Sequence, residues 1–168
     1  MDKSIYLNNM KKKLSGNYDI YENHSINENS YSLFCKYYER NERYIGLKSA
    51  TIYAIENKEY VFFKEIENLT NKNFKSFTEE LANHINSLIT PNHEHMSSTI
   101  TGVILYDNSI EKELIKKIEK FNFQKSFKLG LNGWVDIRII AINLSEKKII
   151  GSKKSTKVIS YYSPTKVN

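Results

Sequence analysis

The sequence contains few of the residues that covalent cross-links or membrane spans require. Its 168 residues include one cysteine, two prolines and six glycines. The single Cys35 cannot form an internal disulfide, and a cysteine-based zinc cluster needs several thiols. No run of about 18 apolar residues is present, and the first residues lack the apolar stretch of a secretory signal. We therefore expect a single cytoplasmic globular domain spanning residues 1–168, with no membrane partner.

Arginine is also scarce, and this changes how the positive charge is interpreted. The chain has 3 Arg against 22 Lys, with 19 Asn and 21 Ile. Lys, Asn and Ile are residues of AT-rich codons, so genome composition alone can produce the formal net charge of +6. The excess positive charge lies in residues 125–168, which contain nine Lys or Arg and only two acids, Asp136 and Glu146. A non-specific nucleic-acid partner and codon drift both remain open explanations.

Hydrophobic periodicity predicts an α/β (α+β) fold with a mixed, largely antiparallel sheet and three helices. The expected order is α-β-β-β-β-α-β-α-β-β-β. The first helix is capped by Ser4 and ended by Gly16, and the second covers residues 70–90 and ends at Pro91. A capping box of Asn108 and Glu111 starts the third helix.

β-Forming runs fill the rest of the chain, separated by polar turns. We expect a loop at 23–30, a turn at 40–43 and a tight hairpin turn at 56–59. The run 99–106 lies between two helices, which predicts a central and partly parallel strand. The runs are 18–21, 31–39, 51–55, 60–63, 99–106, 126–131, 135–143 and 158–162, with a short edge strand at 147–150.

The histidines are the best enzymatic candidates in the sequence. His84 lies on the second helix, and His93, Glu94 and His95 follow where the chain leaves it. Two imidazoles beside a carboxylate can bind a divalent metal and support hydrolysis. The spacing is not that of a zinc protease, however. In the other interpretation His84 is a surface residue of the helix, while His93 and His95 cap its carbonyls.

A second candidate lies on one predicted strand. Alternation places Trp134, Asp136 and Arg138 on the same face. An acid and a guanidinium two residues apart form either a structural ion pair or a recognition site for a substrate or partner. Together with the lysines downstream they make up the binding candidates: Trp134, Asp136, Arg138, Lys147, Lys148, Lys153 and Lys154.

Other motifs favour structural roles. The charges from Glu39 to Tyr44 alternate in sign, as they do in solvated turns. Cys35 stands among aromatic residues in a strand, which is typical of a buried, inert thiol. The glycines from Gly130 to Gly133 lack the strand-to-helix context of a phosphate loop.

The chain resembles a family of uncharacterised proteins of low-GC Gram-positive bacteria. The resemblance rests on Asn41-Glu42-Arg43-Tyr44, on His95-Met96-Ser97, and on Gly133-Trp134-Val135-Asp136-Ile137-Arg138. It covers nearly the whole chain. The family brings no known activity, so it implies no catalytic residue.

The order of elements is also similar to that of the PD-(D/E)xK nuclease fold. That fold implies magnesium bound by an acid on the second core strand and by an acid-x-Lys motif on the third. Here Phe62-Phe63-Lys64 matches the lysine, but Phe62 stands where the acid belongs. The resemblance therefore implies the topology without the nuclease chemistry.

No reactive constellation dominates, so we expect a non-catalytic cytosolic binding or regulatory module without a cofactor. Its partner is a protein or a second copy of the chain. Two alternatives stay open, a metal-dependent hydrolase using the histidines and a weak nucleic-acid binder using the basic C-terminal quarter.

Overall fold

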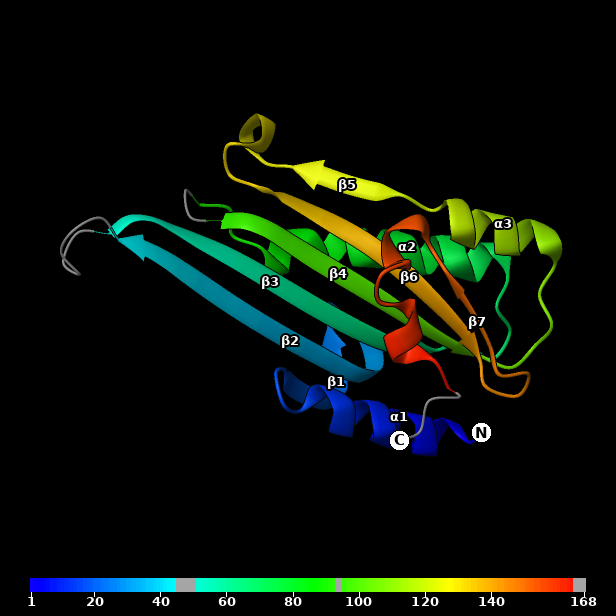
Figure 1. The fold of residues 1–168 in the computed structure, drawn as a ribbon. Helices are drawn as coiled ribbons and strands as arrows, with labels where there is room; N and C mark the ends of the chain where they lie inside the picture. The colour runs from blue at the N-terminus through cyan, green and yellow to red at the C-terminus, as the bar shows by residue number, and fades with distance from the viewer. Residues whose placement is uncertain (45–50, 93–94, 165–168) are drawn as a thin grey trace.

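The computed structural model of the chain describes residues 1–44, 51–92 and 95–164 and consists of one mixed sheet with helices on both faces (Figure 1). The helices are α1 (Lys3–Leu14), α2 (Asn71–Leu88) and α3 (Lys112–Lys120), with short 3-10 turns η1 (Lys128–Gly130), η2 (Lys153–Ser155) and η3 (Ile159–Tyr162). The strands are β1 (Asp19–Ile26), β2 (Asn29–Tyr44), β3 (Thr51–Glu65), β4 (His95–Tyr106), β5 (Phe123–Ser126), β6 (Trp134–Asn143) and β7 (Lys148–Gly151).

The sheet has the order β1-β2-β3-β4-β6-β5, and β7 also pairs with β6. Strand β4 is parallel to both of its neighbours, β3 and β6, whereas the other pairs are antiparallel. Each parallel connection runs through a helix, as a crossover requires. The predicted mixed α+β class with three helices is therefore confirmed, and so is the central position of β4.

The loop predicted at residues 23–30 is wrong, because the two strands meet at a two-residue turn. Asn27 and Glu28 have φ angles of 47° and 69°. Positive φ at both central positions is the type I′ geometry whose twist suits a tight hairpin, and asparagine tolerates it well. Strands β1 and β2 therefore take in the polar residues on both sides of the turn.

Strand β3 is continuous, so the hairpin turn predicted at residues 56–59 is also wrong. Residues Glu56 to Glu59 pair with β2 on one side and with β4 on the other. The turn predicted at residues 40–43 is likewise part of β2, paired with β3. Neighbouring strands on both sides of β3 satisfy its backbone groups, and this overrides the low strand propensity of Glu, Asn and Lys.

Several local details differ from the prediction. Asp2, rather than Ser4, caps α1 by accepting hydrogen bonds from the backbone N–H groups of Ser4 and Ile5. Asn108 does not cap α3, because its side-chain oxygen accepts a bond of 2.7 Å from the backbone N–H of Leu69. The strands predicted at 126–131 and 158–162 are largely η1 and η3, whereas the predicted edge strand at 147–150 is confirmed as β7.

Each face of the sheet is the base of an apolar cluster. Helices α2 and α3 cover one face, where Phe77 and Leu81 pack over Ile100 and Ile137. Helix α1 and the C-terminal turns cover part of the other face, which lies towards the viewer in Figure 1. On this face Met10 of α1 and Phe63 of β3 belong to one buried apolar cluster.

Candidate functional site

The face under α1 changes character along the strands. The residues of this face that pack against α1 are apolar. Further along the same strands the residues of this face become polar. Register places Glu59 beside Thr99, Thr99 beside Asp136, and Asp136 beside Gln124. One step closer to α1, Thr101 lies beside Arg138. Side chains opposite each other on neighbouring strands share a face, so these residues form one polar patch.

The C-terminal segment crosses the sheet beside this patch (red in Figure 1). Ser152 fixes the crossing, because its backbone N–H donates to the carbonyl of Ile139 at 2.8 Å and its Oγ accepts from the N–H of Ile139 at 2.9 Å. A Cβ at Gly151 would lie 2.2 Å from Ser155 Oγ and 2.5 Å from Ile159 Cδ1, so glycine allows the segment to approach the strand this closely. The segment thereby forms a wall above the polar patch.

Two cavities lie between this wall and the sheet, and Arg138 and Lys157 line both of them. We call the two cavities together the Arg138 groove. The cavity towards α1 has a volume of about 370 Å³, and the one towards β5 has about 510 Å³. The first is lined by Leu14, Asn17, Tyr18, Glu59, Arg138, Lys157, Val158, Tyr161 and Tyr162, and the second by Thr99, Gln124, Asp136, Arg138, Lys153, Lys154, Thr156 and Lys157.

Arg138 is held from two sides. Its Nη2 pairs with the carboxylate of Glu59, and its Nε donates to Thr101 Oγ1 at 2.7 Å. Tyr18 lines the same cavity as Glu59. Burial, and then the Glu59 charge, raises the pKa of Tyr18 above its usual value of 10.0, so this phenol stays protonated at neutral pH. Arg138 and Glu59 thus form a half-buried pair across β4.

The other acid of the groove is paired in a similar way. Asp136 binds Lys154, whose Nζ also donates to the carbonyl of Phe123 at 3.1 Å, and Gln124 donates to Asp136 at 3.0 Å. Lys153 and Lys157 make no ion pair within the part of the chain that the structure describes. Four cations and two acids therefore line the groove, and its excess charge is positive.

The structure thus brings together Asp136, Arg138, Lys153 and Lys154 among the predicted binding residues. Trp134 lies on the same face of β6 but next to Ser97 and Ser126, one row beyond the groove. The remaining two do not join them. Lys147, with a φ of 53°, lies in the β6–β7 turn, and Lys148 pairs with Glu146 at 2.6 Å.

The expected surface position of His84 is wrong. Its side chain is 1% exposed beneath α2, and its Nε2 lies 2.6 Å from the hydroxyl of Tyr31. Tyr31 also donates to Glu80, which binds Lys64 at 2.7 Å. Burial lowers the pKa of His84, so its imidazole is neutral at pH 7.

The other members of the proposed metal cluster cannot be placed beside His84. His93 and Glu94 lie outside the described residues, and His95 begins β4. Among the residues that the structure describes, no group of three His, Cys, Asp or Glu side chains is arranged to hold a metal ion. The one cysteine, Cys35, is fully buried, and burial raises the pKa of its thiol to about 12.

The nuclease-like motif is not a metal site either. Phe62 is fully buried in the core, and Lys64 is bound to Glu80 of α2. Because β3 is continuous, Glu56 and Lys58 form another acid-x-Lys pair on this strand, with 3.5 Å between their charged groups. Register places Arg40 and Tyr38 opposite them on β2, where that fold needs an acid.

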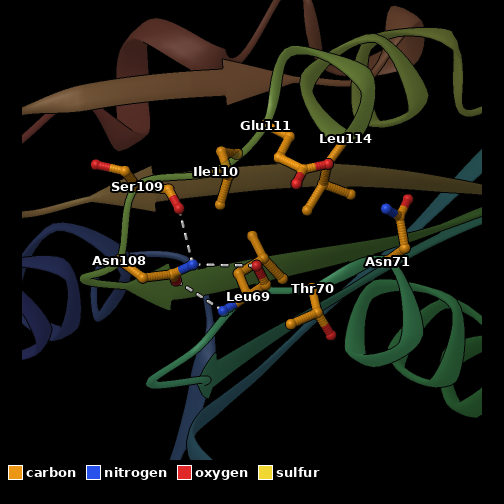
Figure 2. Close-up of a pocket in the computed structure, with 8 residues that line it drawn as sticks. All are labelled: Leu69, Thr70, Asn71, Asn108, Ser109, Ile110, Glu111 and Leu114. Carbon is orange, nitrogen blue, oxygen red and sulfur yellow. Dashed lines mark hydrogen bonds between the residues drawn. The ribbon is translucent and has the colours of Figure 1, made fainter.

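A further cavity of about 220 Å³ lies where α2 and α3 begin (Figure 2). Figure 2 shows Asn108 reaching from the loop before α3 to the backbone of Leu69 before α2. The amide of Asn108 donates to the carbonyls of Leu69 and Ser109 at 3.2 and 3.0 Å. These bonds satisfy the amide and join the starts of the two helices, so we assign this cavity a structural role.

Three residues of the groove have no direct signal in the sequence. The local pattern predicts a turn at Glu59, although this residue lies in β3, and it indicates for Tyr18 only a β-forming run. Lys157 was one lysine among many. The pairing register of β3, β4 and β6 brings Glu59 to Arg138. The segment before β1 and the C-terminal segment bring Tyr18 and Lys157 there, and no local pattern specifies either approach.

Comparison with known proteins identifies a family for the chain. No helix in the described ranges is long and apolar enough to cross a membrane. No curated protein and no solved structure matches the chain. Residues 2–164 match a family described as a domain of unknown function (DUF8052). This match covers nearly the whole sequence, and the chain therefore belongs to the DUF8052 family.

Proposed function

We propose that the domain is a non-catalytic cytosolic binding module that takes a small anionic ligand, a phosphate or a carboxylate, in the Arg138 groove. The observation that carries this proposal is an excess of positive charge on one concave surface, where four cations converge with only two acids. Arg138, Lys153, Lys154 and Lys157 come from β6 and from the segment that crosses the sheet. Lys153 and Lys157 are exposed at the rim and make no ion pair within the described residues.

The groove also offers hydroxyl groups that can complete the recognition of an anion. Thr99, Thr156 and Tyr161 line it beside the cations. Hydrogen bonds from charged donors to an anionic oxygen are the stronger kind, and an arginine already aligned by Thr101 loses little freedom on binding. The groove contains no thiolate or activated hydroxyl, which favours binding over catalysis.

The distribution of the lysines favours a small ligand over a long polyanion. Lys147 and Lys148 lie at the β6–β7 turn, away from the groove lysines 153, 154 and 157. Lys148 and Lys154 are each paired with an acid. A nucleic-acid backbone needs a continuous row of available cations, whereas a single anionic group needs only two or three.

The test is a titration with inorganic phosphate and with citrate at constant ionic strength, followed by amide chemical shifts. We expect shifts centred on Thr101, Arg138 and Lys157. The double substitution Lys153→Glu with Lys157→Glu should weaken binding about tenfold or more, because one charged hydrogen bond contributes roughly 1.5–3 kcal/mol. Both side chains are exposed, so the fold should be unaffected.

The matched control is Lys116→Glu with Lys120→Glu on the exposed surface of α3, which changes the net charge equally. Equal weakening in both variants would show a general charge effect and contradict the groove. A 20-nucleotide single-stranded DNA serves as the competing probe. If it binds with a steep salt dependence that flattens when Lys147, Lys148, Lys153 and Lys154 are changed to Glu, the domain is a nucleic-acid binder instead.

A further inference from the structure

The turn between β5 and β6 exposes two leucines to solvent. The exposed fractions are 102% for Leu129 and 80% for Leu131, the highest among the large apolar side chains that the structure describes. A Cβ added at Gly130, between the two leucines, would meet no atom within 4 Å. Figure 1 shows this turn at the outer edge of the sheet, beyond the end of β5. We call residues 127–133 the leucine loop.

The backbone of the leucine loop fixes this exposure. Lys128 and Leu129 have φ angles of 46° and 55°, and Gly130 follows with 92°. The left-handed region is unfavourable for lysine and leucine, and such strain persists only where the surrounding structure holds it. Here the backbone N–H of Phe127 donates to Gly133 and that of Gly130 donates to Phe127, both at 2.9 Å. The loop is therefore preorganised with its leucines in solvent.

The sequence around the leucines carries positive charge only. From residue 120 to residue 135 the chain contains three lysines and no acid. Lys125 and Lys128 are exposed, and neither forms an ion pair within the described residues. Lys125 lies over the ring of Phe127, and its Nζ donates to Asn86 at 3.3 Å, so its charge stays beside the loop.

Exposed leucines beside lysines are complementary to the surface of an anionic membrane. Leucine side chains gain free energy where they leave water, and lysines are attracted by anionic headgroups just outside the acyl chains. Trp134, half-buried at the base of the loop, is a residue type enriched at that boundary. A protein partner would need a pocket shaped for both leucines and acids around it, whereas a lipid surface offers both without a shaped pocket.

We propose that the leucine loop inserts Leu129 and Leu131 into the surface of an anionic phospholipid membrane, with Lys125 and Lys128 at the level of the headgroups. The expectation of no membrane partner rests on the lack of a long apolar run, and a contact at the lipid surface needs no such run. Two leucines and two lysines give weak, reversible attachment rather than permanent anchoring. This inference is independent of ligand binding in the Arg138 groove.

Co-sedimentation with lipid vesicles at about 0.1 M salt tests the proposal. Wild-type protein should sediment with vesicles of equal parts phosphatidylcholine and phosphatidylglycerol, and much less with pure phosphatidylcholine. Leu129→Ser with Leu131→Ser should lower the partition coefficient about a hundredfold, because each buried leucine accounts for roughly a factor of ten. Ile5→Ser is the control, since it removes an exposed apolar side chain from α1 and should leave the partition coefficient unchanged.

Charge reversal tests the role of the lysines. Lys125→Glu with Lys128→Glu should lower the partition coefficient about tenfold or more, because each lysine near an anionic surface contributes attraction that a glutamate replaces with repulsion. Lys112→Glu with Lys116→Glu, on the exposed surface of α3, changes the net charge equally and should have a smaller effect. Equal losses in the two variants would show a general charge effect and contradict the placement of the loop at the membrane.

Tryptophan fluorescence tests which part of the molecule enters the lipid. Leu129→Trp, made together with Trp134→Phe, places the only tryptophan of the chain at the tip of the loop. Its emission should shift to shorter wavelength when the anionic vesicles are added, because the indole leaves water. Ile5→Trp with Trp134→Phe places the tryptophan on exposed α1 and should show no shift. Circular dichroism should show that every variant remains folded.

Three further results would overturn the proposal. The first is wild-type protein that stays in solution in the presence of the anionic vesicles. The second is a folded serine double variant that binds the vesicles as well as the wild type does. The third is an emission shift at position 5 as large as the one at position 129. If the wild type ignores the vesicles but self-associates, and the serine double variant does not, the leucine loop is a contact between protein chains instead.

Discussion

The two faces of the sheet are built differently. Under α2 the contacts are almost entirely apolar and very close, since a Cβ at Gly102 would lie 2.5 Å from Leu81 and 2.7 Å from Phe77. Under α1 the apolar cluster ends partway along the strands, and the paired charges of Arg138 and Glu59 follow. The first face is sealed by a long helix, whereas a short helix and a C-terminal segment leave the second one partly open.

The difference separates stability from recognition. Burial of apolar side chains drives folding, and α2 with its sheet face supplies much of it. The Arg138 groove lies on the face where burial is incomplete and charged groups remain accessible to a ligand. Substitutions under α2 should therefore change stability without changing phosphate binding. Substitution of the paired Arg138 should change both stability and phosphate binding, whereas substitution of the exposed Lys153 and Lys157 should change phosphate binding alone.

Leu81→Ala should have the largest effect on stability. Leu81 is fully buried between α2 and β4, so truncation removes apolar contacts and leaves a cavity at a cost of roughly 2–5 kcal/mol in unfolding free energy. Urea unfolding measures this loss, and phosphate affinity at low temperature should stay at the wild-type value. Leu129→Ala is the matched control, because Leu129 is fully exposed and should lose about 0.5 kcal/mol or less. Equal losses in the two variants would contradict the assignment of the core.

Arg138→Met should destabilise less, by about 2 kcal/mol, because it leaves the half-buried Glu59 without its partner. The loss should be smaller than for a fully buried pair, since both side chains keep some exposure. Glu59→Met should cost a similar amount, and the double variant should recover about 1–2 kcal/mol of the summed loss. Strictly additive losses in urea unfolding would mean that the two charges do not interact. Phosphate binding should fall in Arg138→Met but not in Leu81→Ala.

The fold can be predicted from the sequence where the local hydrophobic pattern of a segment agrees with the burial of its residues. The apolar stripe of α2, the run of β4 and the alternation of β6 each predict the element that forms. The prediction failed where polar residues sit inside strands. Glu56–Glu59 resembles a turn in isolation, but in the sheet β2 and β4 pair with it on both sides. Tertiary pairing overrides local propensity there.

Only part of the groove can be predicted from the sequence, for a related reason. Asp136 and Arg138 stand out because they are charges on a single apolar strand, so period-two alternation finds them. Their partners Glu59 and Lys154 come from β3 and from the C-terminal segment, and their distance depends on sheet order and register. Local periodicity carries information about faces but not about which distant strands are neighbours.

His84 is a polar exception on the face under α2. Its substitution should have the smallest effect on the unfolding free energy, and this effect should depend on pH. Tyr31 donates its hydroxyl proton to Glu80, so the His84 Nε2 must donate to the Tyr31 oxygen at 2.6 Å. Nδ1 then carries a lone pair, and it has no hydrogen-bond partner among the described residues. Protonation would place a buried N–H without an acceptor there, close to Lys64 of β3, and only Glu80 would offset the new charge.

Because burial lowers the pKa of folded His84 below its usual value of 6.5, the unfolded chain binds the proton more tightly than the folded one. The stability that His84 contributes is therefore complete above pH 6.5 and is lost as the pH falls from 6.5 towards the folded pKa, at up to about 1.4 kcal/mol per pH unit. Urea unfolding at pH 7.5 and 5.5 measures this loss. The decrease in unfolding free energy between the two pH values should be about 1 kcal/mol smaller in His84→Gln than in the wild type. Glutamine cannot titrate, whereas Glu80 and the other carboxylates still do, so the difference between the two proteins isolates the histidine. An identical pH dependence in both would mean that His84 takes up its proton as readily in the folded protein as in the unfolded chain.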